Sequence, residues 1–74
     1  MRTINDLRLF VRASELGSLS AAARESDITP AATSAAMKRL EAELGTPLLI
    51  RSTRHLRLTQ AGERFLQTCR DVLT

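Results

Sequence analysis

The stretch around Thr29 and Pro30 constrains the fold more than any other part of this sequence. Threonine is a good helix cap, and a proline in the first helical position loses no hydrogen bond. Just upstream, Asp27 belongs to the few residue types that tolerate the left-handed conformation of a tight turn. An alanine-rich segment, residues 20–25, precedes that turn. The pattern predicts two helices joined by a short turn, which is the outline of a helix-turn-helix.

The segments before this turn are also helical in pattern. Asn5 is a suitable N-cap, and apolar residues at helical spacing predict a first helix over residues 6–16, ended by Gly17. Ser18 then caps the second helix. Within the helix-turn-helix, Ala23 is small where the two helices cross, and Thr33 stands where an apolar β-branched side chain usually packs.

The helix that begins at Pro30 is expected to run to Leu44 and to end at Gly45. Its predicted apolar stripe is Ala36, Met37, Leu40 and Leu44, extended backward to Ala32 and Thr33. Its predicted outer face carries Ser34, Ala35, Lys38 and Glu41.

Residues 46–58 change in character. Two short apolar-basic runs flank a polar turn, which is typical of a two-stranded hairpin. No acid occurs from Leu44 to Gly62, so the three arginines of this stretch form a positively biased patch: Arg51, Arg54 and Arg57. Thr59 caps a last helix that is apolar at three- and four-residue spacing.

Composition excludes several classes of protein. With 74 residues the chain forms one small domain, too small for an enzyme with a deep cleft. Aromatic residues make up only 3%, which argues against binding single strands by base stacking. A lone Cys69 and a lone His55 predict no disulfide, no metal site and no cofactor, and they favour a reducing, cytoplasmic setting. No apolar run is long enough to span a membrane, and the net charge of +3 favours a polyanionic partner.

The order of residues resembles the DNA-binding domain of LysR-type transcriptional regulators. The matching stretches are Asp6-Leu7-x-Leu9-Phe10, Gly17-Ser18-Leu19-Ser20-Ala21-Ala22-Ala23, Leu40-Glu41-x-Glu43-Leu44-Gly45-x-Pro47-Leu48-Leu49-x-Arg51 and Arg54-x-x-x-Leu58-Thr59-x-Ala61-Gly62. They cover nearly the whole chain.

This resemblance implies a mainly α fold, a winged helix-turn-helix with a three-helix core and a two-stranded β wing, followed by a linker or dimerisation helix. The expected domain covers residues 1–58, and residues 59–74 begin the linker helix. The resemblance also implies double-stranded DNA as partner, a homodimer formed through the last helix, and a C-terminal effector-binding domain for a small molecule that is missing from this sequence.

The recognition helix departs from the family pattern. The family commonly opens this helix with Ser-Gln-Pro-Ala-Val-Ser followed by a long donor, whereas this chain has Pro30 in place of the glutamine and Ala35 in place of the donor. These short side chains cannot form bidentate bonds to bases, although they can contact a thymine methyl group. We therefore expect this helix to read bases only weakly by direct contact. Phosphate contacts and DNA shape are expected to contribute a larger share of the binding.

The candidate DNA contacts fall in three places. Those of the recognition helix are Thr29, Pro30, Ala31, Ser34, Ala35 and Lys38. Those of the wing are Arg51, Thr53 and Arg54, with Arg54 entering the minor groove and His55 as a neighbour. Those of the second helix are Ser18 and Ser20 at its start.

Some of these residues have a simpler alternative role. Thr29 and Ser18 could act only as caps, and Arg51 could brace the wing instead of binding a phosphate. Arg39 could bind DNA or pair with Glu43 four residues on.

The last helix carries the residues expected to take part in dimerisation. They are Phe65, Leu66, Cys69, Val72 and Leu73, part of which could instead complete the core of the domain. Cys69 fits a small buried hydrophobe better than a redox switch.

Two other functions compete with DNA binding. An enzyme would need a nucleophile with a base, paired carboxylates or metal ligands, and the sequence suggests no such set. A protein-interaction module with the shape of a helix-turn-helix is the second alternative, because the recognition helix is rich in alanine. Steep salt dependence of binding to a duplex would separate DNA binding from this alternative.

Overall fold

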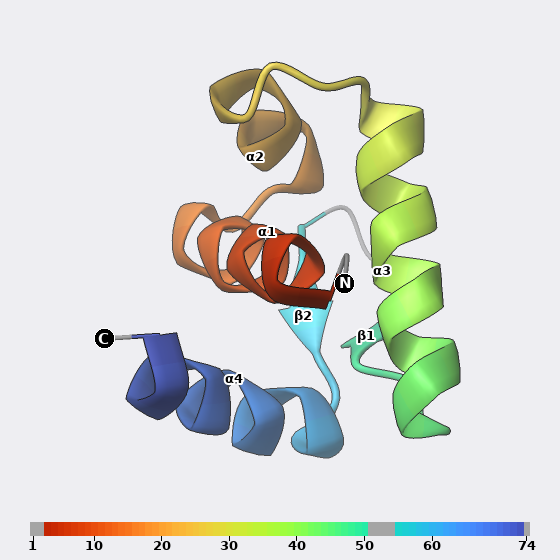
Figure 1. Cartoon of the computed structure of the whole chain (residues 1–74), viewed down its shortest axis with the longest axis vertical. Helices are drawn as coiled ribbons and strands as arrows, with labels where there is room; N and C mark the ends of the chain where they lie inside the picture. Colours follow the sequence, from red (N-terminus) through yellow and green to blue (C-terminus); the bar gives the residue numbers. More distant parts are fainter. Residues whose placement is uncertain (1–2, 51–54, 74) are drawn as a thin grey trace.

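The computed structural model describes residues 3–50 and 55–73, apart from the side chains of Thr3 and Leu73. Within these ranges the chain forms four helices and one two-stranded sheet (Figure 1). In chain order they are α1 (Thr3–Leu16), α2 (Leu19–Glu25), α3 (Pro30–Leu44), β1 (Leu49–Ile50), β2 (Arg57–Leu58) and α4 (Gln60–Leu73). The expected mainly α class and the expected order of elements are confirmed.

The helix ends follow from local chemistry. The Ser18 hydroxyl accepts a hydrogen bond from the Ala21 amide at 3.1 Å, and the Thr29 hydroxyl accepts one from the Ala32 amide at 3.0 Å. Each bond satisfies an amide that has no partner inside its helix. Both predicted caps are confirmed.

The predicted turn residues also have the expected backbone. Gly17 and Gly45 have φ values of 70° and 71°, and Asp27 has a φ of 59°. One helix start was predicted wrongly, because α1 begins at Thr3 and Asn5 lies inside its first turn. Asp6, the predicted first residue of the helix, lies instead at its fourth position, where its carboxylate accepts hydrogen bonds from Arg39 on α3.

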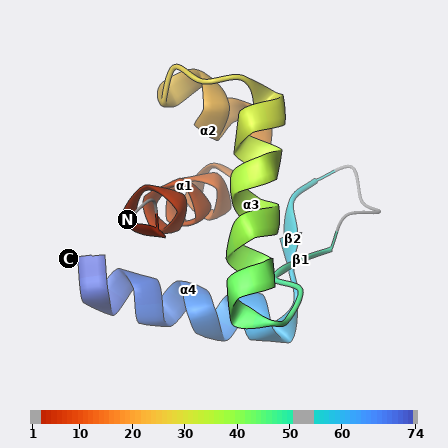
Figure 2. The ribbon, with the colours of Figure 1, turned by 45° about the vertical axis from the view of Figure 1, so that its right-hand side comes forward.

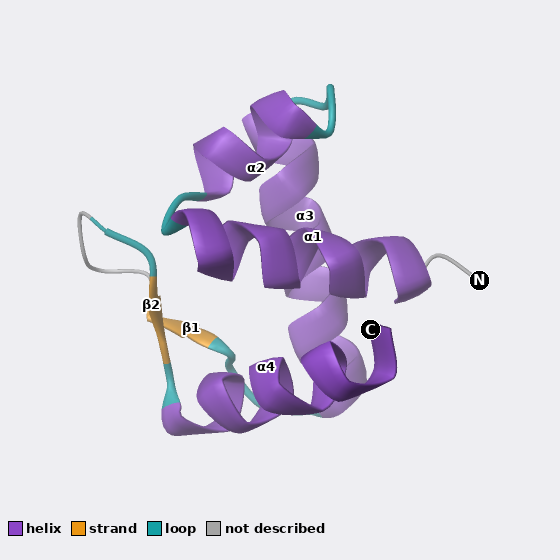
Figure 3. Ribbon diagram, turned by 90° about the vertical axis from the view of Figure 1, so that its left-hand side faces the viewer, coloured by secondary structure: helices purple, strands orange, loops and turns teal. Residues whose placement is uncertain are grey.

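The core lies where α1 meets the other helices. Phe10 of α1 is fully buried together with Met37, Leu40 and Leu48. The ring of Phe10 also contacts the ring of Phe65 on α4, with centroids 5.6 Å apart. Figure 3 shows α1 between α2 and α4, so this central helix joins the helix-turn-helix to the last helix.

The predicted apolar stripe of α3 is only partly correct. Thr33, Ala36, Met37 and Leu40 are buried, whereas Ala32 is exposed and Leu44 has 43% of its surface exposed. Leu44 lies in the last turn of α3, which extends beyond the crossing with α1 (Figure 1). Leu44 lies on the same side of α3 as the buried residues, but α1 does not cover it.

The hairpin pairs Leu49 with Leu58 and Ile50 with Arg57 in antiparallel register. In Figure 2 the hairpin lies beside the lower half of α3, above the start of α4. A two-residue ladder is too short to be stable alone, so it depends on side-chain bonds from the neighbouring helices. Across residues 3–50 and 55–73, no helix has both the length and the apolar character needed to cross a membrane.

Candidate nucleic-acid interface

The α2–α3 pair is held at a close crossing by small buried residues. Ala22, Ala23 and Thr33 are all completely buried. The Thr33 hydroxyl donates to the Thr29 carbonyl oxygen at 3.1 Å, so this polar side chain is satisfied inside the core. The Ile28 amide donates to the Ala23 carbonyl oxygen at 3.0 Å and closes the turn. The expected roles of Ala23, Asp27 and Thr33 agree with this geometry.

A stripe of four exposed residues runs along α3 opposite its buried face. Ala31, Ala35, Lys38 and Ala42 lie at i, i+4, i+7 and i+11, and all four are exposed. We call these four residues the outer stripe. The two earlier candidates Thr29 and Pro30 are also exposed, and Ser34 is half-buried beside the stripe. The surface that α3 presents is therefore made of short side chains and one lysine.

Arg39 is held by α1. Its guanidinium donates to the two carboxylate oxygens of Asp6 at 3.2 and 3.4 Å. Only 5% of the Asp6 side chain is exposed, against 42% for Arg39. The role of Arg39, left open between DNA and Glu43, thus includes a bond that fixes α3 to α1. The pair joins positions 33 residues apart, and no local pattern reveals it.

Glu41 fixes the base of the hairpin. Its carboxylate oxygen Oε2 accepts hydrogen bonds from the Leu48 amide at 2.7 Å and the Leu49 amide at 3.1 Å. The expected outer-face position of Glu41 was wrong, because the chain after Gly45 folds back over this side of α3. Sequence reasoning missed this role, although the matching Leu-Glu-x-Glu stretch already contained the residue.

The start of α4 holds the same segment from the other side. The Thr59 hydroxyl donates to the Pro47 carbonyl oxygen at 2.8 Å and accepts from the Gly62 amide at 2.9 Å. The Thr59 amide donates to the Leu48 carbonyl oxygen at 3.0 Å. Residues 47–49 are therefore attached to both α3 and α4. We call them the wing base.

Other predicted DNA contacts are placed less fully. Arg51, Thr53 and Arg54 lie outside the described residues. His55 and Arg57, at the other end of the hairpin, are exposed. At the start of α2, Ser20 is exposed while Ser18 is half-buried and acts as the cap.

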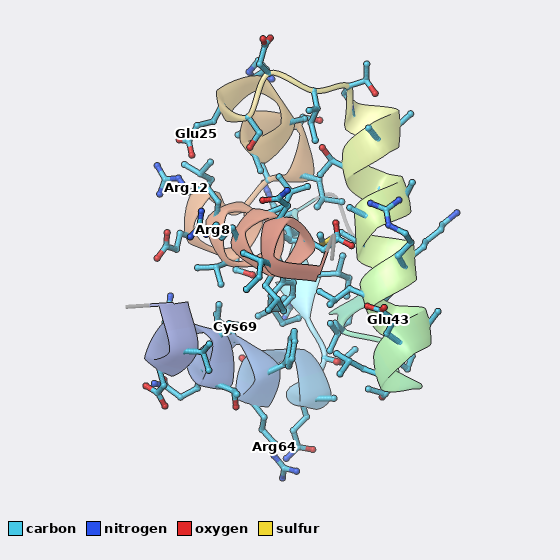
Figure 4. All side chains as sticks on the ribbon, in the orientation of Figure 1. Arg8, Arg12, Glu25, Glu43, Arg64 and Cys69 are labelled. Carbon is cyan, nitrogen blue, oxygen red and sulfur yellow. The ribbon has the colours of Figure 1, made fainter. Side chains whose placement is uncertain are left out.

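The face of the molecule opposite α3 carries a network of ion pairs. Arg12 on α1 binds the Glu25 carboxylate through two nitrogens, the longer of the two bonds measuring 2.9 Å, and it also binds Glu15. Figure 4 shows Arg12 and Glu25 together on that face. The hydrogen bonds from Arg12 lower the pKa of Glu25. This network ties α1 to the end of α2 and leaves the exposed surface of α3 untouched.

The residues expected at a dimer interface divide between core and surface. Phe65 and Leu66 are half-buried against the core, and Cys69 is only 2% exposed. Cys69 is therefore buried in the core of this chain, as expected for a small hydrophobe, and burial raises the pKa of its thiol. Val72 remains 65% exposed, while the side chain of Leu73 lies outside the described part.

The capped α2–α3 pair, the hairpin that follows it and the exposed outer stripe define a winged helix-turn-helix protein. Residues 4–63 match the family model described as "Bacterial regulatory helix-turn-helix protein, lysR family". The chain belongs to this family.

Relatives and solved structures agree with this assignment. The chain is 47% identical over 73 residues to the probable HTH-type transcriptional regulator LtrA of Klebsiella pneumoniae, covering 99% of this chain and 24% of that protein. It is 41% identical over 71 residues to the AhcY transcriptional activator HvrB of Rhodobacter capsulatus, covering 96% of this chain and 24% of that one. The chain thus spans about a quarter of the length of these curated relatives.

Two similar solved structures are complexes with DNA. The BenM DBD bound to catB site 1 DNA superposes with a TM-score of 0.91 at 34% identity, covering 95% of this chain and 75% of that one. The CbnR DBD–DNA complex gives a TM-score of 0.88 at 37% identity, covering 95% and 80% of the two chains.

Proposed function

We propose that this chain binds double-stranded DNA sequence-specifically, as the N-terminal domain of a bacterial LysR-type transcriptional regulator. The observation that carries the proposal is the exposed outer stripe of α3, presented on a frame that superposes on DNA-bound relatives. A helix of this kind enters the major groove and places its N-terminal residues against base edges. Thr29, Pro30, Ala31, Ser34 and Ala35 are the residues so placed.

Charged and capping residues supply the contacts to the backbone of the DNA. Lys38, exposed one turn beyond Ser34, is positioned to reach a phosphate. Ser18 and Ser20 lie at the start of α2 and are expected to approach a second phosphate. In the wing, Arg54 is proposed to enter the minor groove, with Arg51 and Thr53 at the adjacent phosphates.

The arrangement of the longer regulator is part of the same proposal. Residues 1–58 form the DNA-binding domain, and residues 59–74 begin a helix that pairs with a second copy. A two-fold dimer would match a palindromic site. A separate effector-binding domain would take the small molecule, and the protein would act in the cytoplasm without catalysing a reaction.

Salt dependence tests DNA binding. A fluorescent duplex, selected from a random library by this chain, is titrated with protein at several salt concentrations and followed by anisotropy. We expect a steep linear fall of log affinity with log salt, because bound phosphates release counterions. Failure to bind any duplex at low salt would favour a protein-interaction module instead.

Two variants locate the contacts on the surface. Lys38→Ala is expected to weaken binding to all duplexes and to reduce the salt slope by about 1. Arg64→Ala is the matched control, because Arg64 points away from α1 at the outside of α4 (Figure 4). An equal effect of both variants would contradict the placement of DNA against α3.

The wing needs its own test, because its tip residues act in the other groove. Arg54→Ala is expected to weaken binding most on duplexes with A·T flanks, where a narrow minor groove strengthens the negative potential. The same affinity series on G·C-flanked duplexes is the control. An Arg54→Ala variant that binds like the unsubstituted chain would contradict the minor-groove placement.

A further inference from the structure

The first part of α3 exposes almost no hydrogen-bonding side chain. Between Pro30 and Lys38 the exposed residues are one proline and three alanines, Pro30, Ala31, Ala32 and Ala35. Ser34 is half-buried. Beyond them, Arg39 is committed to the buried carboxylate of Asp6. The helix therefore presents methyl and ring carbons where a recognition helix presents its base-reading groups.

Such a surface can distinguish only one feature of the major groove. Base pairs differ there in their donors, their acceptors and the 5-methyl group of thymine. An alanine methyl group neither donates nor accepts, so it cannot separate guanine from adenine, but it gains by excluding water from another methyl group. The short side chains also let the helix backbone come close to the base edges.

We propose that α3 reads the 5-methyl groups of pyrimidines, which in unmodified DNA means thymine, through Ala31 and Ala35. The inference rests on the proposed function and specifies which chemical group the helix recognises. The two alanines are four residues apart, which is about 6 Å along the helix axis. Base pairs are about 3.4 Å apart. The two sensitive positions are therefore expected within about three base pairs in each half-site.

Base analogues test the proposal without changing the protein. In a duplex selected by this chain, each thymine is replaced singly by deoxyuridine, which keeps the Watson–Crick face and lacks the methyl group. We expect a loss of affinity of about threefold to fourfold for each methyl group that is read, and no change elsewhere. Binding is measured by anisotropy at constant salt.

Cytosine analogues separate methyl reading from hydrogen-bond reading. At a sensitive position, 5-methylcytosine paired with guanine carries the methyl group but a different set of donors and acceptors. We expect it to bind nearly as well as thymine, whereas unmethylated cytosine binds as weakly as deoxyuridine. Equal affinity for thymine and deoxyuridine at every position would overturn the proposal while leaving DNA binding intact.

Two glycine variants assign the contact to a residue. Ala35→Gly is expected to abolish the difference between thymine and deoxyuridine at one position of each half-site. Ala32→Gly is the matched control, since it makes the same change on the exposed flank of the same helix and is expected to preserve the difference. An identical response of both variants would overturn the assignment to the outer stripe.

Should Ala35→Gly fail to fold, the base analogues still decide the proposal with the unsubstituted chain. Absence of binding to any duplex at low salt would remove the proposed function and this inference together.

Discussion

Gly62 is a helical glycine that the close packing around it requires. A Cβ built at this position would lie 2.2 Å from the Leu48 carbonyl oxygen and 3.1 Å from its carbon. Both atoms belong to the backbone of the wing base, which is bound to α3 and α4 and cannot shift freely. The glycine therefore allows α4 to begin directly against this segment.

Gly62→Ala is expected to destabilise the fold by about 1–3 kcal/mol, which is the range for overpacking. This expectation opposes helix propensity, which favours alanine over glycine by about 1 kcal/mol. Thermal unfolding followed by circular dichroism measures the change. Ala42→Gly, at an exposed position of α3, is a control for propensity alone. A Gly62→Ala variant as stable as the unsubstituted chain would contradict the close contact.

The thiol of Cys69 is shielded from solvent in the core. Burial raises the pKa of its thiol, so the thiolate that reacts with disulfide reagents is scarce in the folded chain. We expect slow modification of the native protein and fast modification in denaturant. In the unfolded chain this thiol has its ordinary pKa of 9.0, so it ionises at a lower pH than in the folded chain. Its contribution to the free energy of unfolding therefore falls as the pH rises above 9.0. Equal modification rates in native and denatured protein would contradict its burial.

Among the elements, the hairpin depends most on its neighbours. Two residues per strand cannot hold a wing in place, and the carboxylate of Glu41 supplies two further hydrogen bonds. Glu41→Ala leaves two amides without partners and is expected to cost about 2–3 kcal/mol. Chemical denaturation measures this loss, and Lys38→Ala on the exposed surface of the same helix is the control. A similar loss in both variants would contradict the role of Glu41.

The attachment of α2 to α1 is expected to depend on pH. Hydrogen bonds from Arg12 lower the pKa of Glu25 below its ordinary value of 4.5. A lowered pKa in the folded state stabilises the fold above pH 4.5, and the contribution is lost as pH falls through the folded pKa. Glu25→Gln removes it.

Melting temperatures measured across the acid range test this prediction. The unsubstituted chain and Glu25→Gln are expected to differ at neutral pH and to converge in acid, while Glu63→Gln on α4 serves as control. A difference in melting temperature between the unsubstituted chain and Glu25→Gln that stays constant at every pH would contradict the pH-dependent contribution of Glu25.

The elements also show which features of this fold could be predicted from the sequence. The caps at Ser18 and Thr29 and the turns at Gly17, Asp27 and Gly45 were predictable, because each depends on residues within a few positions. The hairpin and the order of the helices also followed from the apolar pattern and from the family resemblance. In contrast, the bonds of Asp6 to Arg39 and of Glu41 to Leu48 join segments that only folding brings together. Periodicity alone assigned Glu41 to the outer face and Leu44 to the core, because it does not show where a neighbouring element ends.

The last helix, α4, has one face in the core of the molecule and one end exposed to solvent. Its Phe65 and Cys69 complete the core under α1, whereas Val72 is 65% exposed on the last turn. If this end of α4 meets a second copy, as proposed, Val72→Glu is expected to shift the chain toward monomer at a given concentration, because a buried unpaired charge is costly. Sedimentation velocity measures the shift, with Gln67→Glu as control on the opposite side of α4. An unchanged association constant would contradict a dimer formed through this face.

The attachment of the wing base to both α3 and α4 has a consequence for how the molecule opens. Leu48 and Leu49 are loop and strand-edge residues by secondary structure, and their amides would ordinarily be among the first to exchange hydrogen with solvent. Those amides donate to Glu41 of α3, while Thr59, just before α4, binds the neighbouring carbonyl groups, so the wing base cannot leave either helix without breaking hydrogen bonds. Exchange of both amides is expected to require separation of the wing base from α3, so they are expected to exchange more slowly than other loop amides.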